Sequence, residues 1–389
     1  MQTDTHIRTS MRFVMLLGTV SLFADATYEG ARSITGPFLA SLGASATVVG
    51  AVAGLGELIG YALRLFSGYI SDRTQKYWAI TLCGYFVNLI AVPMLALAGR
   101  WEIAALLIIA ERLGKAIRTP ARDLMLSQAT QRIGRGWGFG LHEAFDQIGA
   151  VLGPLLVAVA FSRSASYPVS FGILLVPAVL ALCTLQWARS LYPRPQDLEA
   201  SLPKIETRSF PSSFWLYVVA VSLIGAGYAD FPLIAYHFKK TSLVPDTWIP
   251  VFYAVAMGTD ALAALLLGRL FDRIGVLTLA FACILSSLAA PLVFLGNTNM
   301  ALLGILLWGL GMGGQESVLR AAVAEMVPMH RRGAAYGILN ASYGVCWFIG
   351  SASMGVLYGV SIWVLVFFSL SLQVAAAPIL LIVHSRQQA

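Results

Sequence analysis

The chain has 389 residues, of which 58% are hydrophobic and only 12% are charged, and its mean hydropathy is +0.76. A soluble globular domain carries about 25% charged residues, so this composition excludes that class and indicates an integral membrane protein. The formal net charge of +7 does not require a nucleic-acid partner, and none is expected, because membrane topology accounts for the basic excess.

Runs of about 20 mainly apolar residues recur along the chain, and each can cross a bilayer as a helix. They lack the apolar/polar alternation of barrel strands, and in lipid the backbone must satisfy its own polar groups. The predicted fold is therefore all-α, with twelve transmembrane helices in two pseudo-symmetric six-helix bundles. The predicted spans are residues 13–38, 46–69, 77–98, 101–121, 137–161, 167–189, 213–237, 248–269, 276–296, 299–319, 333–359 and 361–384.

The first predicted span contains three charged residues, Asp25, Glu29 and Arg32. At about 100° per residue they share one narrow stripe of the helix. A charge near the bilayer centre costs roughly 3 kcal/mol or more, so this stripe is expected to face the bundle interior or a cavity. We interpret its carboxylates as the site of ion coupling, with Arg32 tuning them.

Polar residues in other predicted spans are further candidates. Glu57 in the second span and Asp260 in the eighth are expected at a depth similar to that of Asp25. Neither Asp25 nor Glu57 has an evident cationic partner at that depth, which favours a role in coupling or cation binding. Asn340 in the eleventh span is a candidate contact for substrate, with a helix–helix hydrogen bond as the alternative.

The fourth and fifth predicted spans contain a second group of charges. Running antiparallel, they bring Arg112 level with Asp146, and Lys115 level with His142 and Glu143. His142 and Asp146 are four residues apart on one helical face, and a histidine beside carboxylates can titrate near neutral pH. The group is therefore a candidate proton relay, and the alternative is a set of ion pairs with only a structural role.

The predicted loops differ in their content of Lys and Arg. The side that includes both termini has most of them, among which we count Arg8, Arg12, Arg118 and Arg122, whereas the other side has only Arg100, Arg163, Lys239 and Lys240. The positive-inside rule then predicts a multi-pass protein of the cell inner (plasma) membrane with both termini in the cytoplasm.

A polar segment rich in proline divides the chain into two equal sets of spans. The predicted organisation is an N-terminal six-helix bundle at 1–187, a cytoplasmic linker at 188–212 and a C-terminal six-helix bundle at 213–389. The two bundles resemble each other, because "GYISDR" at 68–73 recurs as "GRLFDR" at 268–273, and Gly153 matches Gly350. Duplicated bundles of this kind place a substrate site between the two halves. One half rocks against the other, which opens the site to each side of the membrane in turn.

These motifs resemble those of the major facilitator superfamily over essentially the whole chain. The loop motif of that family after helix 2 is matched, and is matched again after helix 8, while the helix 5 motif Gly-x-x-x-Gly-Pro is associated in the family with exporters. The resemblance implies that these residues control the conformational change: Gly68, Asp72, Arg73, Gly268, Asp272, Arg273, Gly149, Gly153 and Pro154.

The expected function is secondary active transport, as proton-coupled efflux of a small organic molecule by alternating access. One alternative is transport of an anionic metabolite through Arg32, Arg112 and Lys115; another is efflux of a metal ion bound by His142, Glu143 and Asp146. An enzyme is not expected, because "HEAFD" at 142–146 lacks the second histidine of the HExxH motif. We expect a monomer in the lipid bilayer that uses the proton gradient and has no cofactor or bound structural metal.

Overall fold

The computed structural model describes residues 2–130, 135–193, 210–328 and 331–388, and all secondary structure in these ranges is helical. The elements are α1 (Gln2–Ser41), α2 (Ala46–Thr74), α3 (Tyr77–Met94), η1 (Leu95–Leu97), α4 (Trp101–Thr130), α5 (Arg135–Ser164), α6 (Tyr167–Ile173), α7 (Leu175–Leu191), α8 (Ser212–Gly227), α9 (Phe231–Thr241), α10 (Ile249–Ile274), α11 (Leu277–Ser287), α12 (Ala289–Leu295), α13 (Thr298–Met326), α14 (Arg332–Val360) and α15 (Ile362–Gln388).

The all-helical prediction is confirmed, and in the described residues ten helical segments are long and apolar enough to cross a membrane. They coincide with ten of the twelve predicted spans. The other two predicted spans lie in α1 and α4, which are 40 and 30 residues long and therefore also long enough to cross. These two helices are less apolar than the other ten segments, because they contain charged residues of the candidate site.

The transmembrane segment at Ser212–Thr241 consists of two helices, α8 and α9, separated at Tyr228–Asp230. One backbone group at this break is satisfied by a side chain, since the Trp308 indole Nε1 donates to the Ala229 carbonyl at 2.8 Å. The Asp230 carboxylate accepts hydrogen bonds from Trp347 Nε1 at 2.9 Å and from Ser351. A helix break inside a membrane is tolerated when protein groups replace the lost partners in this way.

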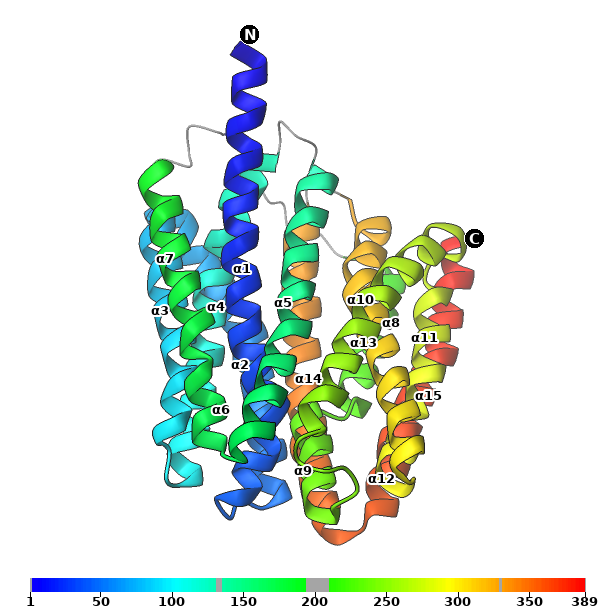
Figure 1. Cartoon of the computed structure of the whole chain (residues 1–389). Helices are drawn as coiled ribbons and strands as arrows, with labels where there is room; N and C mark the ends of the chain where they lie inside the picture. Colours follow the sequence, from blue (N-terminus) through cyan, green and yellow to red (C-terminus); the bar gives the residue numbers. More distant parts are fainter. Residues whose placement is uncertain (1, 131–134, 194–209, 329–330, 389) are drawn as a thin grey trace. The chain divides into compact units, whose positions relative to one another are not determined.

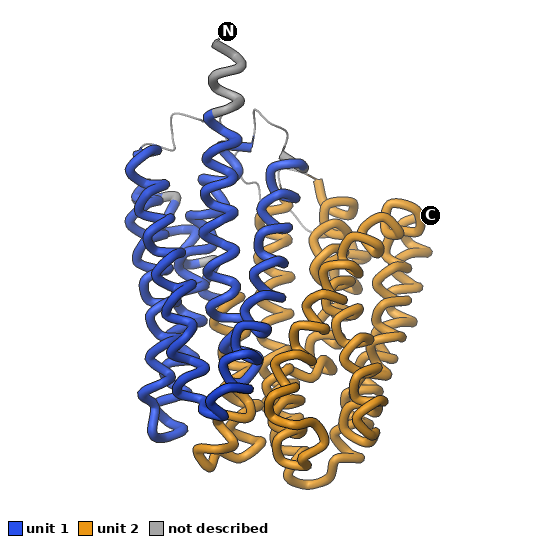
Figure 2. The backbone as a smooth tube through the Cα atoms, viewed as in Figure 1, with its two compact units in different colours: residues 1–34, 62–202 blue, residues 35–61, 203–389 orange. Residues whose placement is uncertain are grey.

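The described helices form two compact units (Figure 2). Unit 1 comprises residues 1–34 and 62–202, and unit 2 comprises residues 35–61 and 203–389. Residues 35–61 belong to unit 2 because the first half of α2 packs closely on α14: a Cβ on Gly50 would overlap the Ser351 carbonyl, and Thr47 Oγ1 donates to the Gly355 carbonyl at 3.4 Å. The predicted linker falls mainly on residues 194–209, outside the described residues, so its role as the bundle boundary stays a prediction.

Each unit contains the same close helix contact. In unit 1, where α1, α4 and α5 run alongside one another (Figure 1), Gly153 of α5 lies against the Ala26 carbonyl of α1. In unit 2, Gly350 of α14 lies against the Ala226 carbonyl of α8. Small residues allow helix backbones to approach this closely in membranes. The two contacts involve equivalent positions of the sequence repeat, so the repeat is also a repeat of packing.

We expect Gly153→Ala and Gly350→Ala each to lower the free energy of unfolding by about 1–3 kcal/mol, because the added Cβ would overlap a backbone carbonyl that cannot move freely. Chemical unfolding of the purified protein in detergent micelles measures this change.

Matched controls are available on the same two helices, since a Cβ at Gly140 of α5 or Gly359 of α14 has no heavy atom within 4 Å. Gly140→Ala and Gly359→Ala should be neutral or slightly stabilising, because alanine favours a helix over glycine. Equal losses in test and control variants would contradict the packing role of Gly153 and Gly350.

Candidate functional site

Three helices of unit 1 each contribute one stripe of polar side chains to a single group, which we term the charge cluster. The spacings are those of one helical face: residues 21, 25, 28 and 29 on α1, residues 115, 118 and 122 on α4, and residues 142 and 146 on α5. The charge cluster is defined as Ser21, Asp25, Tyr28, Glu29, Lys115, Arg118, Arg122, His142 and Asp146.

Asp25 is buried on α1, with only 6% of its surface exposed, and its carboxylate accepts a hydrogen bond from the Tyr28 hydroxyl. Gly149 of α5 lies directly against this part of α1, since a Cβ there would overlap the Leu22 carbonyl and lie 3.0 Å from the Asp25 Cβ. The glycines of the helix 5 motif therefore bring the α5 backbone against the helix turn that holds Asp25.

The α4 stripe supplies two cations within electrostatic range of Asp25, Lys115 and Arg118. Lys115 Nζ lies 3.9 Å from Glu29 Oε1 and 3.9 Å from the centre of the Tyr28 ring. The Arg118 guanidinium is fully buried, 4.1 Å from the Tyr85 ring centre and 5.7 Å from that of Tyr28. Cation–π contacts of this type stabilise a desolvated cation, so α4 holds two positive charges beside the carboxylates of α1.

The α5 stripe is connected to α1 and α4 by hydrogen bonds. His142 Nδ1 lies 3.3 Å from Asp146 Oδ1, and its Nε2 lies 3.1 Å from Ser21 Oγ. Arg122 Nη1 donates to the same Ser21 oxygen at 3.1 Å. A histidine with a carboxylate on one nitrogen and a hydroxyl on the other is a group through which a proton can move.

The structure corrects the placement of two arginines. Arg118 and Arg122, assigned above to a cytoplasmic loop, lie within α4, which continues to Thr130. A buried arginine needs compensation, and Arg122 obtains it from Ser21 and from the adjacent Asp123, whose carboxylate lies 2.8 Å from Nη2. The spacing of residues 115, 118 and 122 on one helical face is the sequence signal that could have identified them.

The ion pairs also differ from the expected ones. Lys115 pairs with Glu29, and Asp146 pairs with His142. Arg112 Nε lies 3.3 Å from Glu111 Oε2, and the other Glu111 oxygen accepts from Asn88 Nδ2 at 2.8 Å. Glu111, a buried carboxylate that sequence reasoning did not single out, therefore accompanies Arg112. Arg32, the third charge of α1, is half-buried.

Glu143 does not join His142 and Asp146. The Glu143 side chain is exposed and accepts a weak hydrogen bond from Gln147 Nε2 at 3.5 Å. Among the described residues, no three His, Cys, Asp or Glu side chains gather closely enough to hold a metal ion. The geometry thus provides no ligand set for the metal-efflux alternative.

Three predicted site residues lie in unit 2 and not in the charge cluster: Glu57, Asp260 and Asn340. Glu57 is half-buried on α2 within electrostatic range of Tyr343, whose ring packs edge-on to Tyr61 at 5.3 Å. Asp260 is buried on α10, which packs on α13, and Asn340 is half-buried on α14.

The loop-motif residues lie at helix ends. Gly68 and Gly268 are not packed tightly, since the nearest atoms to an added Cβ lie 3.6 and 3.8 Å away. Arg73 is exposed and donates to the Tyr69 hydroxyl at 3.3 Å. Asp272 and Arg273 are exposed at the end of α10, Pro154 lies inside α5, and the side chain of Asp72 is outside the described part of the structure.

Comparison with known proteins agrees with the observed architecture. The Major Facilitator Superfamily model matches residues 17–260 and 231–388, which together span nearly the whole chain. The chain belongs to the Major Facilitator Superfamily. It is accordingly a multi-pass membrane transporter, and the resemblance seen in the sequence motifs is confirmed.

Individual relatives cover most of the chain. An uncharacterized protein of Mycobacterium tuberculosis is 43% identical over 375 residues, which are 94% of this chain and 91% of that protein. An uncharacterized MFS-type transporter of Methanocaldococcus jannaschii is 27% identical, covering 90% of this chain and 89% of its own. A crystal structure of the peptide transporter POT with sulfate has a TM-score of 0.76 over 96% of this chain and 94% of that one; at 13% identity it shows the fold alone.

We expect Lys115 and Glu29 to be energetically linked in a double-mutant cycle. Lys115→Met or Glu29→Gln alone leaves a buried charge with a partner missing, whereas the double variant removes both charges. The interaction energy should be about 1–3 kcal/mol, measured by chemical unfolding in detergent micelles.

The control cycle uses Arg100→Gln and Glu102→Gln, an ion pair of 3.1 Å whose side chains are 73% and 45% exposed. Because solvent screens exposed charges, this pair should show little measurable interaction. An interaction between Lys115 and Glu29 no larger than that of the control would contradict the compact charge cluster.

Proposed function

We propose that the protein is a proton-coupled secondary transporter that exports a small organic molecule, with the charge cluster as its coupling site. The observation that supports this most directly is the buried Asp25 carboxylate, which lies within electrostatic range of Lys115, Arg118 and Asp146. A carboxylate in such surroundings can change its proton occupancy when a nearby charge moves.

The balance of charges in the cluster suits exchange. Its three carboxylates, Asp25, Glu29 and Asp146, are matched by three cations, Lys115, Arg118 and Arg122, and His142 is also present. Asp123, outside the cluster and partly exposed, adds one negative charge beside Arg122. One added proton, or one cationic group of a bound ligand, changes the net charge of the buried cluster by a whole unit. At low dielectric this change has a large electrostatic energy. Proton and substrate binding can then exclude each other, and exchange follows from that competition.

The helix 5 glycines provide the mechanical part of the proposal. Gly149 and Gly153 place the α5 backbone against α1. The contacts on α1 are at Leu22 and Ala26, in the helical turn that contains Asp25. A shift of α5 along α1 would move His142 and Asp146 relative to Ser21 and would alter the surroundings of Asp25. The motif's association with exporters favours the outward direction.

The anionic-metabolite alternative has less support. It requires available basic side chains, but Lys115 already pairs with Glu29 and Arg112 already pairs with Glu111. A substrate with a positively charged group is the better match, because it can replace Lys115 or a proton at the carboxylates of α1.

The test begins with a ligand screen by thermal shift on the purified protein, followed by measurement of proton release in weakly buffered detergent solution for each ligand found. Wild type should release protons on binding, because ligand and proton compete for the charge cluster. Asp25→Asn should abolish or strongly reduce the release, while the exposed-site control Glu102→Gln should leave it unchanged.

Ligand binding without proton release in wild type would refute the coupling mechanism. Unchanged release in Asp25→Asn would refute the role of Asp25, and Asp146→Asn then identifies whether the α5 carboxylate performs it.

A further inference from the structure

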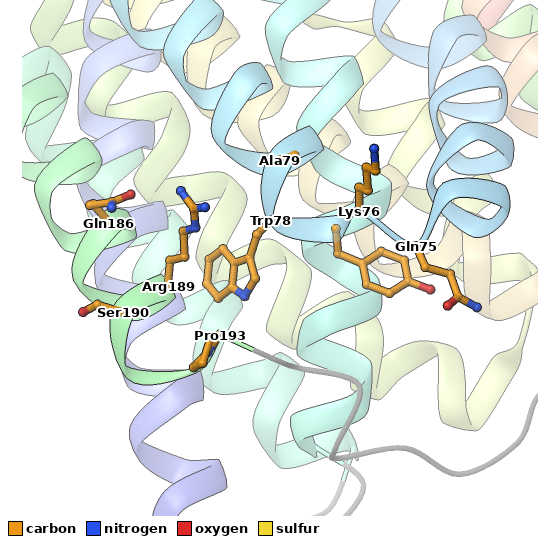
Figure 3. Close-up of a pocket in the computed structure, with 9 residues that line it drawn as sticks. Gln75, Lys76, Trp78, Ala79, Gln186, Arg189, Ser190 and Pro193 are labelled. Atoms are coloured by element: carbon orange, nitrogen blue, oxygen red, sulfur yellow. The ribbon is translucent and has the colours of Figure 1, made fainter.

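A second site lies at the end of unit 1 where the α2–α3 turn meets the end of α7. It is a pocket with a volume of about 500 Å³. Figure 3 shows its side chains around this junction. The lining residues are Gln75, Lys76, Tyr77, Trp78, Ala79, Gln186, Arg189, Ser190 and Pro193.

The floor of the pocket is held in place by Trp78, which is buried. Its indole Nε1 donates to the Tyr192 carbonyl at 2.8 Å, which fixes the end of α7 against the start of α3. The Phe13 ring of α1 packs edge-on to Trp78 at 6.2 Å and to Tyr192 at 5.0 Å. The start of α3, the end of α7 and α1 thus meet below the pocket.

The pocket is electropositive. Lys76 and Arg189 are both exposed on its walls, and none of the nine lining residues is acidic. Gln75, Gln186 and Ser190 add neutral polar groups. The first turn of α3 also lines the pocket, and its N-cap residue Lys76 makes no side-chain capping bond, so the positive end of the helix dipole adds to the two cations.

The pocket lies where a lipid headgroup would be. It occupies the ends of the α3 and α7 spans, and on α7 the side chains of Trp187 and Leu191 beside it are 59% and 52% exposed. Tryptophan is enriched at the membrane–water interface, and exposed apolar side chains next to a polar pocket suit acyl chains next to a headgroup. By the distribution of Lys and Arg, this end of the spans is expected to face the cytoplasm.

We propose that this pocket binds the phosphate group of an anionic phospholipid, with Lys76 and Arg189 as its charged ligands and Trp78 as its floor. Basic pockets between transmembrane helices on the cytoplasmic side are suited to anionic headgroups. The site is separate from the charge cluster, and the inference does not depend on proton coupling.

The test is lipid retention measured by native mass spectrometry of the full chain, purified in detergent with equal amounts of phosphatidylglycerol and phosphatidylcholine. Wild type should retain phosphatidylglycerol selectively. The variant Lys76→Gln/Arg189→Gln should bind it at least about tenfold more weakly, because each cation near a membrane surface contributes to anionic lipid affinity.

A matched control removes two exposed cations elsewhere, Arg269→Gln/Arg386→Gln, and should retain the lipid as wild type does. Equal retention by the test variant, or equal loss in the control, would overturn the proposal. Displacement of the lipid by millimolar inorganic phosphate would overturn the lipid assignment in favour of free phosphate. The single variant Arg189→Gln keeps the test valid if the double variant does not fold.

Discussion

The arrangement of unit 1 depends on neutralising the charges of α1 inside an apolar bundle. Asp25 and Glu29 cannot face lipid, so cations must reach them from neighbouring helices. Lys115 and Arg118 do so from α4, and α5 can approach α1 closely because Gly149 and Gly153 have no side chains. Removal of the glycines would separate the helices, and removal of the cations would leave buried negative charge. The close packing of α5 on α1 and the pairing of charges between α1 and α4 therefore depend on each other at this site.

The same helix contact in the two units serves different chemistry. With the repeat offset of 200 residues, Asp25 corresponds to Gly225, Glu29 to Ala229 and Tyr28 to Tyr228. Tyr28 donates to a carboxylate, whereas Tyr228 donates to the Trp308 carbonyl beside a helix break. Unit 2 therefore has small residues, Gly225 and Ala229, at the positions where α1 has its two carboxylates. This asymmetry is consistent with coupling in unit 1 and recognition of substrate shape in unit 2.

The sequence was sufficient to predict the helical class, ten spans that the structure matches, and the stripe on α1, because these follow from hydropathy and helical period. It did not reveal that α4 continues past the apolar run, so Arg118 and Arg122 were assigned to a loop. It also predicted the wrong partner for Lys115, because helical period gives the face of a residue but not the rotation of one helix against another. Glu111 was missed for the same reason, since its hydrogen bond with Asn88 of α3 depends on how α3 and α4 are rotated against each other.

Transport in proteoliposomes tests most directly the proposed role of Asp25, which is to link proton movement to substrate movement. With a ligand that the protein binds, Asp25→Asn should still exchange labelled for unlabelled substrate across the membrane at saturating substrate concentration. Glu29 remains on α1 to hold the substrate, and exchange at equilibrium needs no net proton transfer. When a pH difference is imposed, wild type should accumulate substrate against its concentration gradient. The Asp25→Asn variant should not. Equal pH-driven accumulation by the variant and wild type would contradict the account.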